Sequence, residues 1–570
     1  MTIICSSNIL AVITDLGFGI LSANCSQREP RTIGIKKLWG RIAVAAAAVW
    51  CAGGVYIQHA SAGAVLPFDD IAASYARNEI IDLYNQRILT GTSETSFSPA
   101  KPITRAEFIT VLDRLLKLEP VPGPISPYTD VAKNAWYYGW IQAAVQLELA
   151  SGTSGSTFAP AQPVTRQEAA VWMARALKQP ENTTAAQTAF KDKTEVAAWA
   201  GSAVGAVSRL GLMKGDEMGA FRPSDKITRQ ETAVLIDRVL QRKPWAAELA
   251  EAPDQQIVLG WQYGQTTAQY ESTILRSNVN TLSPRWFFVG GTGAVTDYTD
   301  ASLVHWAEKK GKQIWAMMGN RSDLAATHQL LSSASSRNTA VNQLAAAVSK
   351  YGLDGLNIDF ENVGGADRAA LTAFVTQLAA RLHALGAVLS VDVSPDLGTD
   401  WTEAFDYAAL GRQSDYIVMM GYDEHYSGSR NPGSNASLPY DEKAVSTLLK
   451  AVPSQKVILA LPFFNHDWTL KQDGISPSSA PLSLIEQNAI VSRYGQRPVW
   501  DSVIGQYVFS YTAQSLKHTI WLEDGRSLTA KFNLAAKHKL AGIAYWHIGG
   551  ESPDIWTSLG NAEKFAGYSF

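Results

Sequence analysis

The sequence predicts a multidomain protein in which a (β/α)8 TIM barrel with a small α+β insertion follows three mainly helical repeats. The chain has 570 residues, more than a single hydrophobic core normally organises. One motif recurs three times in the first half of the chain with a period of roughly 60 residues. Further along, short apolar runs alternate with helical stretches, which is typical of repeated βα units.

The composition is that of a soluble globular protein. The formal net charge is −3, so nothing indicates electrostatic attraction to nucleic acid. The 17 Trp and 20 Tyr residues suit a carbohydrate-handling protein, because aromatic faces stack on sugar rings, although aromatic side chains also fill cores. The cysteines are Cys5, Cys25 and Cys51. All three precede the predicted export cleavage site described next, so the exported chain is expected to have no disulfide.

Residues 1–64 are predicted to be a leader with a secretory signal. Basic residues within 31–41 precede the apolar stretch Ile42–Tyr56, and small residues follow, with cleavage expected after Ala62 or Ala64. An uncleaved anchor is the alternative, although the apolar stretch is short for a membrane span. An exported protein without disulfides fits a bacterial wall protein.

Three repeats follow the leader. Each contains a Phe-x-Pro tripeptide and then Thr-Arg-x-Glu, beginning at Thr104, Thr165 and Thr228. Each Thr and Glu precede an apolar helical run and form a capping box, in which the two side chains satisfy free amides at a helix start. The predicted boundaries of the repeats and of the linker after them are 66–120, 126–180, 188–242 and 243–256.

The arginine of each motif has no such local explanation. Arg105, Arg166 and Arg229 fall in the first turn of a helix, where a cation opposes the helix dipole. A nearby anionic ligand would explain this placement. Pairing with a nearby Glu or with an adjacent repeat would explain it equally well, so the sequence leaves both alternatives open.

These units resemble S-layer homology domains over about residues 66–242. The resemblance implies three helical units around a pseudo-threefold axis, and non-covalent attachment to an anionic secondary wall polysaccharide. It makes the motif arginines candidates for binding that polysaccharide. The aspartates near the start of each repeat are further candidates: Asp70, Asp130 and Asp192.

Residues 257–570 are predicted to form the barrel. The candidate strands are 257–261, 281–289, 313–318, 354–361, 388–393, 415–422, 456–461 and 541–546. Residues from about 463 to 516 exceed a normal connection and are predicted to form the insertion, beside the cleft. A doubly wound open sheet is the alternative. No Gly-x-Gly-x-x-Gly follows a strand, so dinucleotide binding has no support, and no cofactor is expected.

The fourth candidate strand carries most of the chemical information. Its side chains alternate between two faces, so Asn357, Asp359 and Glu361 share one face and apolar residues the other. Carboxylates on the inner face of a buried strand are unfavourable. At the C-terminal end of a barrel strand they indicate an active site at the barrel mouth.

Motifs on three strands resemble glycoside hydrolase family 18, in particular its bacterial wall- and spore-associated branch. The family's Asp-x-x-Asp-x-Asp-x-Glu, its Met-x-Tyr-Asp and the tryptophan beneath its sugar site each have a counterpart here. The matched residues are Asp354, Asn357, Asp359 and Glu361, then Met420, Tyr422 and Asp423, and finally Trp546.

The resemblance implies a retaining hydrolysis in which the substrate's N-acetyl group takes part. Glu361 would protonate the glycosidic oxygen and then activate water. The N-acetyl carbonyl would attack the anomeric carbon, while Asp359 holds the acetamide N–H and Tyr422 holds the acetamide carbonyl. Trp546 would form the floor of the sugar site.

Asn357 stands where the family often has Asp. Because two close carboxylates raise one another's pKa, we expect Asp359 to ionise more readily in this chain. Trp261 and Trp286 lie at or near strand ends and are candidates for lining the sugar subsites. Asp423 is a candidate either for supporting Tyr422 or for facing solvent.

The leading interpretation is a secreted hydrolase at the cell wall or S-layer surface of a bacterium, acting on peptidoglycan or another N-acetylglucosamine polymer. A chitinase acting on external chitin is the second hypothesis. A catalytically silent glycan-binding wall protein is the third, although such family members usually lose the acid that Glu361 supplies here. No pair of His residues has metal-ligand spacing, and no membrane span is expected in the mature chain.

Overall fold

The computed structural model describes residues 66–180, 190–251, 256–470 and 477–570, together with strand residues 3–6, 9–12 and 19–20. Residues 1–65 are a unit of their own, in which β1 (Ile3–Ser6), β2 (Ile9–Val12) and β3 (Gly19–Ile20) pair in an antiparallel sheet. The predicted signal segment lies outside the described residues. None of the helices within the described part of the chain has the length and apolar character needed to cross a bilayer.

Each repeat contributes a pair of helices. The pairs are α1 (Arg77–Asn85) and α2 (Arg105–Leu115), α3 (Tyr138–Gln146) and α4 (Arg166–Ala176), and α5 (Gly201–Arg209) and α6 (Arg229–Leu240). The predicted capping boxes are present at the starts of α2, α4 and α6, where Thr104, Thr165 and Thr228 exchange hydrogen bonds with the Glu three residues later.

Backbone hydrogen bonds join the three repeats in a cycle. The N–H of Ile103 donates to the carbonyl of Ile227, Val164 donates to Ile103, and Ile227 donates to Val164, each at 3.0 Å. This is the arrangement expected for three similar units around an axis. The predicted linker 243–256 begins with a helix, α7 (Lys243–Ala250), which has Pro at its start and buries Trp245.

Residues 257–548 contain a closed parallel barrel. Its strands are β4 (Ile257–Gln262), β5 (Thr281–Val289), β7 (Gln313–Gly319), β8 (Gly355–Asp359), β9 (Val388–Val393), β10 (Tyr416–Met420), β11 (Val457–Pro462) and β17 (Gly542–Ile548). β4 pairs with both β5 and β17, which closes the ring and rules out the open doubly wound sheet. The short strand β6 (Val295–Asp297) pairs antiparallel with β5.

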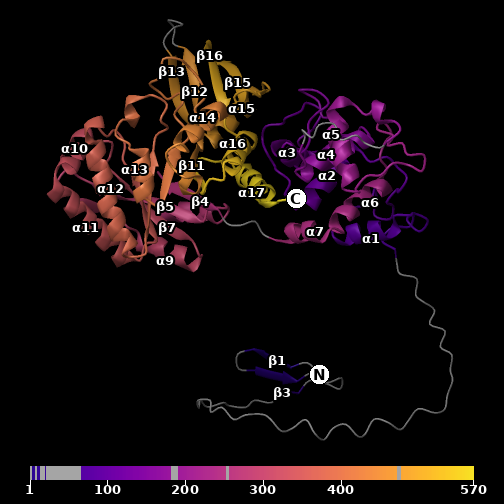
Figure 1. The fold of residues 1–570 in the computed structure, drawn as a ribbon, viewed down its shortest axis with the longest axis horizontal. Helices are drawn as coiled ribbons and strands as arrows, with labels where there is room; N and C mark the ends of the chain where they lie inside the picture. Colours follow the sequence, from indigo (N-terminus) through magenta and orange to yellow (C-terminus); the bar gives the residue numbers. More distant parts are fainter. Residues whose placement is uncertain are drawn as a thin grey trace. The chain divides into compact units, whose positions relative to one another are not determined.

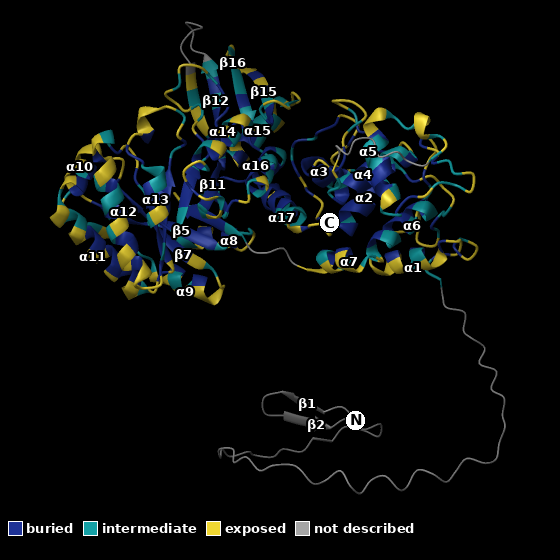
Figure 2. Cartoon of the chain, in the orientation of Figure 1, coloured by how far each residue is buried: buried dark blue, intermediate teal, exposed yellow. Residues whose placement is uncertain are grey.

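Helices cover the outside of these strands (Figure 1). They are α8 (Thr267–Ile274), α9 (Ala301–Lys309), α10 (Leu324–Ser332), α11 (Ala334–Tyr351), α12 (Arg368–His383), α13 (Tyr407–Gln413), α14 (Leu438–Leu448), α16 (Gly525–Lys537) and α17 (Asp554–Gly567). Their outer surfaces are exposed, whereas the strands are buried on both faces (Figure 2), as expected for a parallel sheet between two apolar layers.

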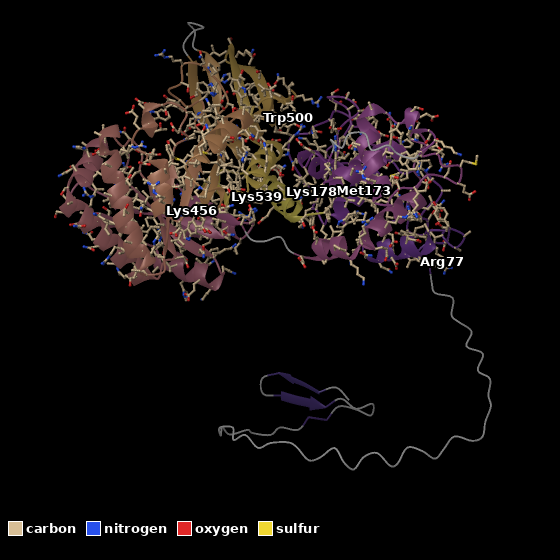
Figure 3. All side chains as sticks on the ribbon, viewed as in Figure 1. Arg77, Met173, Lys178, Lys456, Trp500 and Lys539 are labelled. Atoms are coloured by element: carbon tan, nitrogen blue, oxygen red, sulfur yellow. The ribbon has the colours of Figure 1, made fainter. Side chains whose placement is uncertain are left out.

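One apolar layer fills the barrel interior and includes Leu259, Trp261, Trp315 and Met317; the other lies between strands and helices. Lys456, which Figure 3 labels, lies at the N-terminal end of β11. Its Nζ donates to the backbone carbonyls of Gly411 and Ser414, before β10. This contact holds together the end of the barrel opposite the predicted site.

The insertion follows β11, as predicted. It consists of β12 (Phe464–Leu470), β13 (Pro477–Ser483), α15 (Leu484–Tyr494), β14 (Val499–Asp501), β15 (Gln506–Ala513) and β16 (Leu516–Leu522). The five strands form an antiparallel sheet in the order β13-β12-β16-β15-β14. The sheet therefore extends somewhat beyond the predicted end near residue 516.

Candidate active site

The barrel mouth gathers the predicted catalytic side chains. Asp359 is the last residue of β8, and Glu361 follows two residues later. Tyr422 and Asp423 follow the end of β10, and Trp546 lies in β17 near its C-terminal end. Burial, and after it the charge of Glu361, raises the pKa of both Asp359 and Asp423.

Asn357 lies inside the barrel, fully buried, and both ends of its amide are bonded. Its Oδ1 accepts from the indole Nε1 of Trp261 at 2.8 Å and from the hydroxyl of Ser283 at 3.3 Å. Its Nδ2 donates to the hydroxyl of Ser390 at 3.0 Å and to Oδ1 of Asp392 at 2.6 Å. A carboxylate could accept the first two bonds but could not donate the last two, so this environment selects an amide.

Asp392, on β9, is a buried carboxyl group that the motif comparison missed. Burial raises its pKa well above the usual range, the charge of Asp359 raises it further, and the bond from Asn357 lowers it. Burial likewise raises the pKa of Asp359 to about 7; the charge of Glu361 adds to this and that of Arg285 opposes it. Burial thus holds the pKa of Asp359 above its usual range even though position 357 carries no charge, and the expected effect of Asn357 on Asp359 stays a prediction.

Glu361 is exposed, and the loop after β7 holds its backbone on both sides. Its N–H donates to Oδ1 of Asn320 at 3.1 Å, and its carbonyl accepts from Nδ2 of Asn320 at 2.6 Å. The hydroxyl of Ser322, which sequence reasoning missed, donates to Oε2 of Glu361 at 2.5 Å. A carboxyl group that is fixed in position and open to solvent can exchange a proton with a bound substrate.

Tyr422 is buried, and burial raises its pKa well above the usual range, so its hydroxyl stays protonated and can donate. Its carbonyl accepts from the hydroxyl of Tyr440 at 3.1 Å. Asp423 has φ of 64°, in the left-handed region, and its N–H donates to Asn435 at 3.1 Å. Burial, followed by the charge of Glu361, raises the pKa of Asp423 to about 6.

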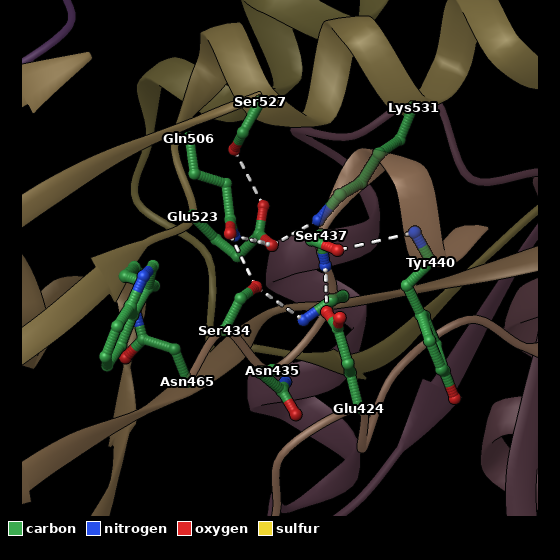
Figure 4. Close-up of polar contacts among 12 residues, drawn as sticks. Glu424, Ser434, Asn435, Ser437, Tyr440, Asn465, Gln506, Glu523, Ser527 and Lys531 are labelled. Carbon is green, nitrogen blue, oxygen red and sulfur yellow. Dashed lines mark hydrogen bonds and ion pairs between the residues drawn. The ribbon is translucent and has the colours of Figure 1, made fainter. Parts of the chain in front are cut away.

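A buried polar network supports the turn that carries Tyr422 (Figure 4). Glu424 accepts from the backbone N–H at the start of α14 at 2.8 Å. Ser434 donates to Gln506 of β15 at 2.5 Å, and Gln506 donates to Glu523 at 2.6 Å. Glu523 also pairs with Lys531 of α16, and both of these side chains are fully buried. The network ties the segment after β10 to the insertion and to an outer helix.

Trp546 is half-buried and belongs to an aromatic corner at the mouth. Its ring centroid lies 5.8 Å from that of Trp261 and 5.5 Å from that of Tyr263. The guanidinium carbon of Arg285 lies 6.0 Å from the Trp546 centroid. Met420, also half-buried, ends β10 against the interior apolar layer. Both positions are compatible with the predicted contact with a sugar.

Three predicted substrate contacts lie elsewhere. Asp354 precedes β8 at the opposite end of the barrel, where Oδ2 accepts from the N–H of Ile314 at 2.8 Å. Trp261 is 1% exposed and its indole is bonded to Asn357 inside the barrel. Trp286 is buried in the apolar layer between strands and helices. The two tryptophans are buried, so neither exposes a ring face to a sugar, and Asp354 lies at the opposite end of the barrel.

In the structure, each motif arginine forms an ion pair with a Glu of the next repeat in the cycle. Of the two explanations that the sequence left open, this is pairing within the protein. The nitrogen–oxygen distances are 2.6 Å for Arg105–Glu168, 3.7 Å for Arg166–Glu231 and 3.2 Å for Arg229–Glu107. Each arginine is buried and also donates to backbone carbonyls of the repeat it contacts. The pairings explain all three arginines without a ligand.

The aspartates near the start of the repeats also have intramolecular partners. Asp70, Asp130 and Asp192 each accept two backbone N–H groups from the Phe-x-Pro loop of their own repeat, at 2.7 to 2.9 Å. These bonds fix the loops, and the two bonded oxygens of each carboxylate face the protein. The pattern explains why every repeat carries this Asp and gives no sign of a ligand contact.

A groove of about 220 Å³ opens beside one of the arginine pairs. It is lined by Tyr75 of the first repeat, by Arg166 of the second, and by Lys214, Arg222 and Arg238 of the third. Two carboxylates also line it, so the four cations leave a local excess of positive charge. Tyr75 is 66% exposed and offers a ring face at the edge of the groove.

The structure shows no candidate metal centre in the residues it describes. No group of three or more His, Cys, Asp or Glu side chains within the described ranges is placed to hold a metal ion.

Comparisons with known proteins identify the two parts separately. Residues 283–551 match glycosyl hydrolases family 18. The S-layer homology domain matches residues 67–109, 127–170 and 189–233. These matches confirm both resemblances, and the family-18 match makes the barrel a glycoside hydrolase domain.

The chain is 26% identical over 325 residues to the uncharacterized glycosylase YvbX of Bacillus subtilis, covering 55% of this chain and 93% of that protein. It is 28% identical over 242 residues to the cortical fragment-lytic enzyme of B. subtilis, covering 40% of this chain and 54% of that protein. The chain thus spans nearly all of the first relative but about half of the second.

Solved structures with the same fold include the spore cortex-lytic enzyme SleL of Bacillus cereus, with TM-score 0.51, 23% identity, and coverage of 55% of this chain and 75% of that one. The chitinase of Chromobacterium violaceum has TM-score 0.50 and 24% identity, with coverage of 54% and 99%. These likenesses confirm the predicted barrel fold.

Proposed function

Residues 283–551 belong to glycosyl hydrolase family 18 and follow three S-layer homology domains, and from this premise we propose a surface-anchored, retaining hydrolase that cleaves β-1,4 bonds after N-acetylglucosamine in peptidoglycan. The observation that carries the proposal is the meeting of three groups at the barrel mouth. Glu361 is an acid open to solvent, Asp359 is a carboxyl with a pKa of about 7, and Tyr422 is a protonated phenol.

In the proposed reaction, the acetamide oxygen of the bound N-acetylglucosamine attacks the anomeric carbon while Glu361 donates its proton to the departing glycosidic oxygen. The carboxylate of Asp359 accepts the acetamide N–H and stabilises the positive charge of the ring that forms. The hydroxyl of Tyr422 holds the acetamide oxygen in line. Glu361 then takes a proton from water as that water attacks the same carbon, which restores the acid and retains the configuration.

The names of similar proteins favour peptidoglycan over chitin as the substrate. The cortical fragment-lytic enzyme and the cortex-lytic enzyme SleL are named for lysis of spore cortex or its fragments. The fold is shared equally with a chitinase, so this preference rests on the relatives and on the presence of wall-binding domains. Chitin is the second candidate.

Anchoring is proposed to use the groove that Tyr75 edges. Its excess of positive charge suits the anionic wall polysaccharide that S-layer homology domains are expected to bind. Arg166 lines the groove while its guanidinium faces Glu231 at 3.7 Å and donates to the carbonyls of Phe221 and Lys214. Lys214 and Arg222 are the cations that distinguish this groove from the equivalent positions in the other two repeats, Ser151 and Ala159 in one and Thr90 and Ser98 in the other.

The activity is tested by mass spectrometry of products after incubating the full chain with purified peptidoglycan and, separately, with chitin oligomers. Glu361→Gln is expected to lower the rate by roughly 10³-fold, because it removes the proton donor. Glu308→Gln, on the exposed surface of α9, is the matched control and is expected to behave as the parent. Fragments with reducing-end N-acetylglucosamine support the proposal; products from chitin alone would assign a chitinase, and binding without products would assign a silent glycan-binding protein.

The anchor is tested by sedimentation of the Glu361→Gln protein with purified cell walls. Lys214→Gln combined with Arg222→Gln is expected to move most of the protein to the supernatant at physiological salt. Lys309→Gln combined with Lys450→Gln removes the same charge from the barrel surface and is expected to leave sedimentation as it was. Equal loss with both pairs would show that the groove is not the attachment site.

A further inference from the structure

Two arginines at the barrel mouth have no hydrogen-bonded acceptor in the described part of the chain. Neither guanidinium, of Arg285 or of Arg321, forms a hydrogen bond or ion pair with another residue in the described part of the chain, and Nε of Arg285 is buried without a partner. Buried donors in proteins are normally bonded to protein or to ordered water, so the position of Arg285 suits a water or a ligand acceptor. Sequence reasoning gave neither residue a role.

Aromatic rings hold both side chains in place. The guanidinium carbon of Arg285 lies 4.9 Å from the ring centroid of Tyr263 and 5.7 Å from that of Phe288. The guanidinium carbon of Arg321 lies 3.8 Å from the centroid of the same Phe288 ring. Stacking uses the flat face of a guanidinium and leaves the N–H groups at its edge free for a planar acceptor such as a carboxylate.

Both arginines also border the reacting groups. Arg285 lies 6.0 Å from the Trp546 centroid, and its charge lowers the pKa of Asp359 against the larger effect of burial. Arg321 immediately precedes Ser322, whose hydroxyl bonds Glu361. The two cations thus occupy the rim of the mouth beside the acid and beside the proposed sugar floor.

We infer that Arg285 and Arg321 form a subsite for the carboxylate of an acidic sugar next to the cleaved N-acetylglucosamine. The inference rests on the proposed function, since it assigns neighbours to the sugar at the cleavage point. A chitin chain is neutral and offers these cations no charged group to bind. The acidic sugar of peptidoglycan carries a carboxylate on its ring substituent, either free as a lactyl group or extended into a peptide stem that ends in further carboxylates.

Binding measurements in the Glu361→Gln background test the subsite without depending on turnover. The ligands are stem-free glycan strands with free lactyl carboxylates, the same strands with those carboxyls converted to methyl amides, and strands with intact stems. The acidic stem-free strands are expected to bind roughly tenfold more tightly than their amides, the size of one charge-assisted hydrogen bond. Either Arg321→Gln or Arg285→Gln, added to the Glu361→Gln protein, is expected to remove this preference.

Arg381→Gln, on the outer helix α12, is the matched control and is expected to keep the tenfold preference. Preference only for strands with intact stems would place the recognised carboxylate on the peptide. The inference would be overturned if the Glu361→Gln protein bound acidic stem-free strands, amidated strands and strands with intact stems equally well. This holds even if the parent enzyme hydrolyses peptidoglycan. A carboxylate preference in a parent protein that releases no products would overturn the proposed hydrolysis and leave the subsite standing.

Discussion

Asn357→Asp restores the residue that the family often has at this position, and the structure predicts that the change destabilises this barrel. Asn357 donates two hydrogen bonds, one of them to Asp392 at 2.6 Å. A carboxyl group at position 357 loses both donors and brings a second acid against Asp392. At acid pH the introduced group can stay protonated and donate to Asp392, so the loss there is small.

The loss grows as the pH rises. Two unit charges about 4 Å apart repel by about 4 kcal/mol at an effective dielectric constant of about 20. Avoiding that repulsion requires one group to keep its proton well above its usual pKa, which costs a similar amount. We therefore expect the free energy of unfolding to fall by about 4 kcal/mol at pH 8 and by about 1 kcal/mol at pH 5. The loss of about 4 kcal/mol at pH 8 corresponds to a drop in Tm of roughly 8 °C.

The double variant Asn357→Asp with Asp392→Asn supplies the control. It exchanges the amide and the carboxyl across the same contact, while Trp261 and Ser283 still donate to position 357. Thermal denaturation at pH 5 and pH 8 should show that the exchange recovers more than half of the loss. A single variant as stable as the parent at pH 8, or a double variant no better than the single, would refute the reasoning.

Four further predictions concern Asp359, Ser322 and the supporting network. Since the pKa of Asp359 is raised to about 7, kcat/KM should increase with pH up to about 7, and a flat profile between pH 5 and 8 would contradict the role proposed for its carboxylate. The same raised pKa means that Asp359→Asn should stabilise the fold above pH 7 by up to about 4 kcal/mol. The gain should vanish below about pH 4, where Asp359 is protonated in both the folded and the unfolded chain. Denaturant titrations at pH 4 and pH 8 measure this gain. Ser322→Ala removes the 2.5 Å bond to Glu361 and should lower kcat roughly tenfold, whereas a change confined to KM would show that Ser322 acts only on substrate binding. Lys531→Met leaves Glu523 charged and buried and should destabilise the barrel by about 3–5 kcal/mol, and the further change Glu523→Gln should recover part of this loss in chemical denaturation if the missing charge is the cause.

The sequence was sufficient for the barrel because each strand is an apolar run between helical stretches. The predicted strands agree closely with the observed ones, and the differences have a common cause. Strands predicted over 354–361 and 415–422 end earlier, at Asp359 and Met420. Their last polar residues leave the sheet because the side chains that form the site must turn toward the mouth.

The site could be predicted only as far as motifs reach along one strand. Asp392 is one of three polar residues around Asn357 that come from other strands, and its significance depends on a pairing between β8 and β9 that no single-strand pattern shows. A signal was available, since Asp392 interrupts the apolar run Val388–Val393 on the same face as Ser390. Trp261 was misread for the converse reason, because its strand position is right but its indole is bonded inside the barrel.

The repeats show the same limit between neighbouring units. The sequence identified a repeated arginine with no local partner, and it could not choose between an anionic ligand and a carboxylate on another repeat. The choice depends on how the repeats meet. In the structure the Glu of each capping box serves two purposes, since it caps its own helix and pairs with the arginine of the preceding repeat.

The closed cycle of the repeats has a consequence for how they come apart. In an open tandem array, a terminal unit can be trimmed and the others keep their neighbours. Here Arg229 of the last repeat reaches Glu107 of the first, so the array has no terminal unit and each repeat lies between the other two. Removing any one of them breaks two of the three junctions at once. Proteolysis or truncation within one repeat should therefore unfold all three repeats in a single step, and, if they are the proposed anchor, release the protein all at once.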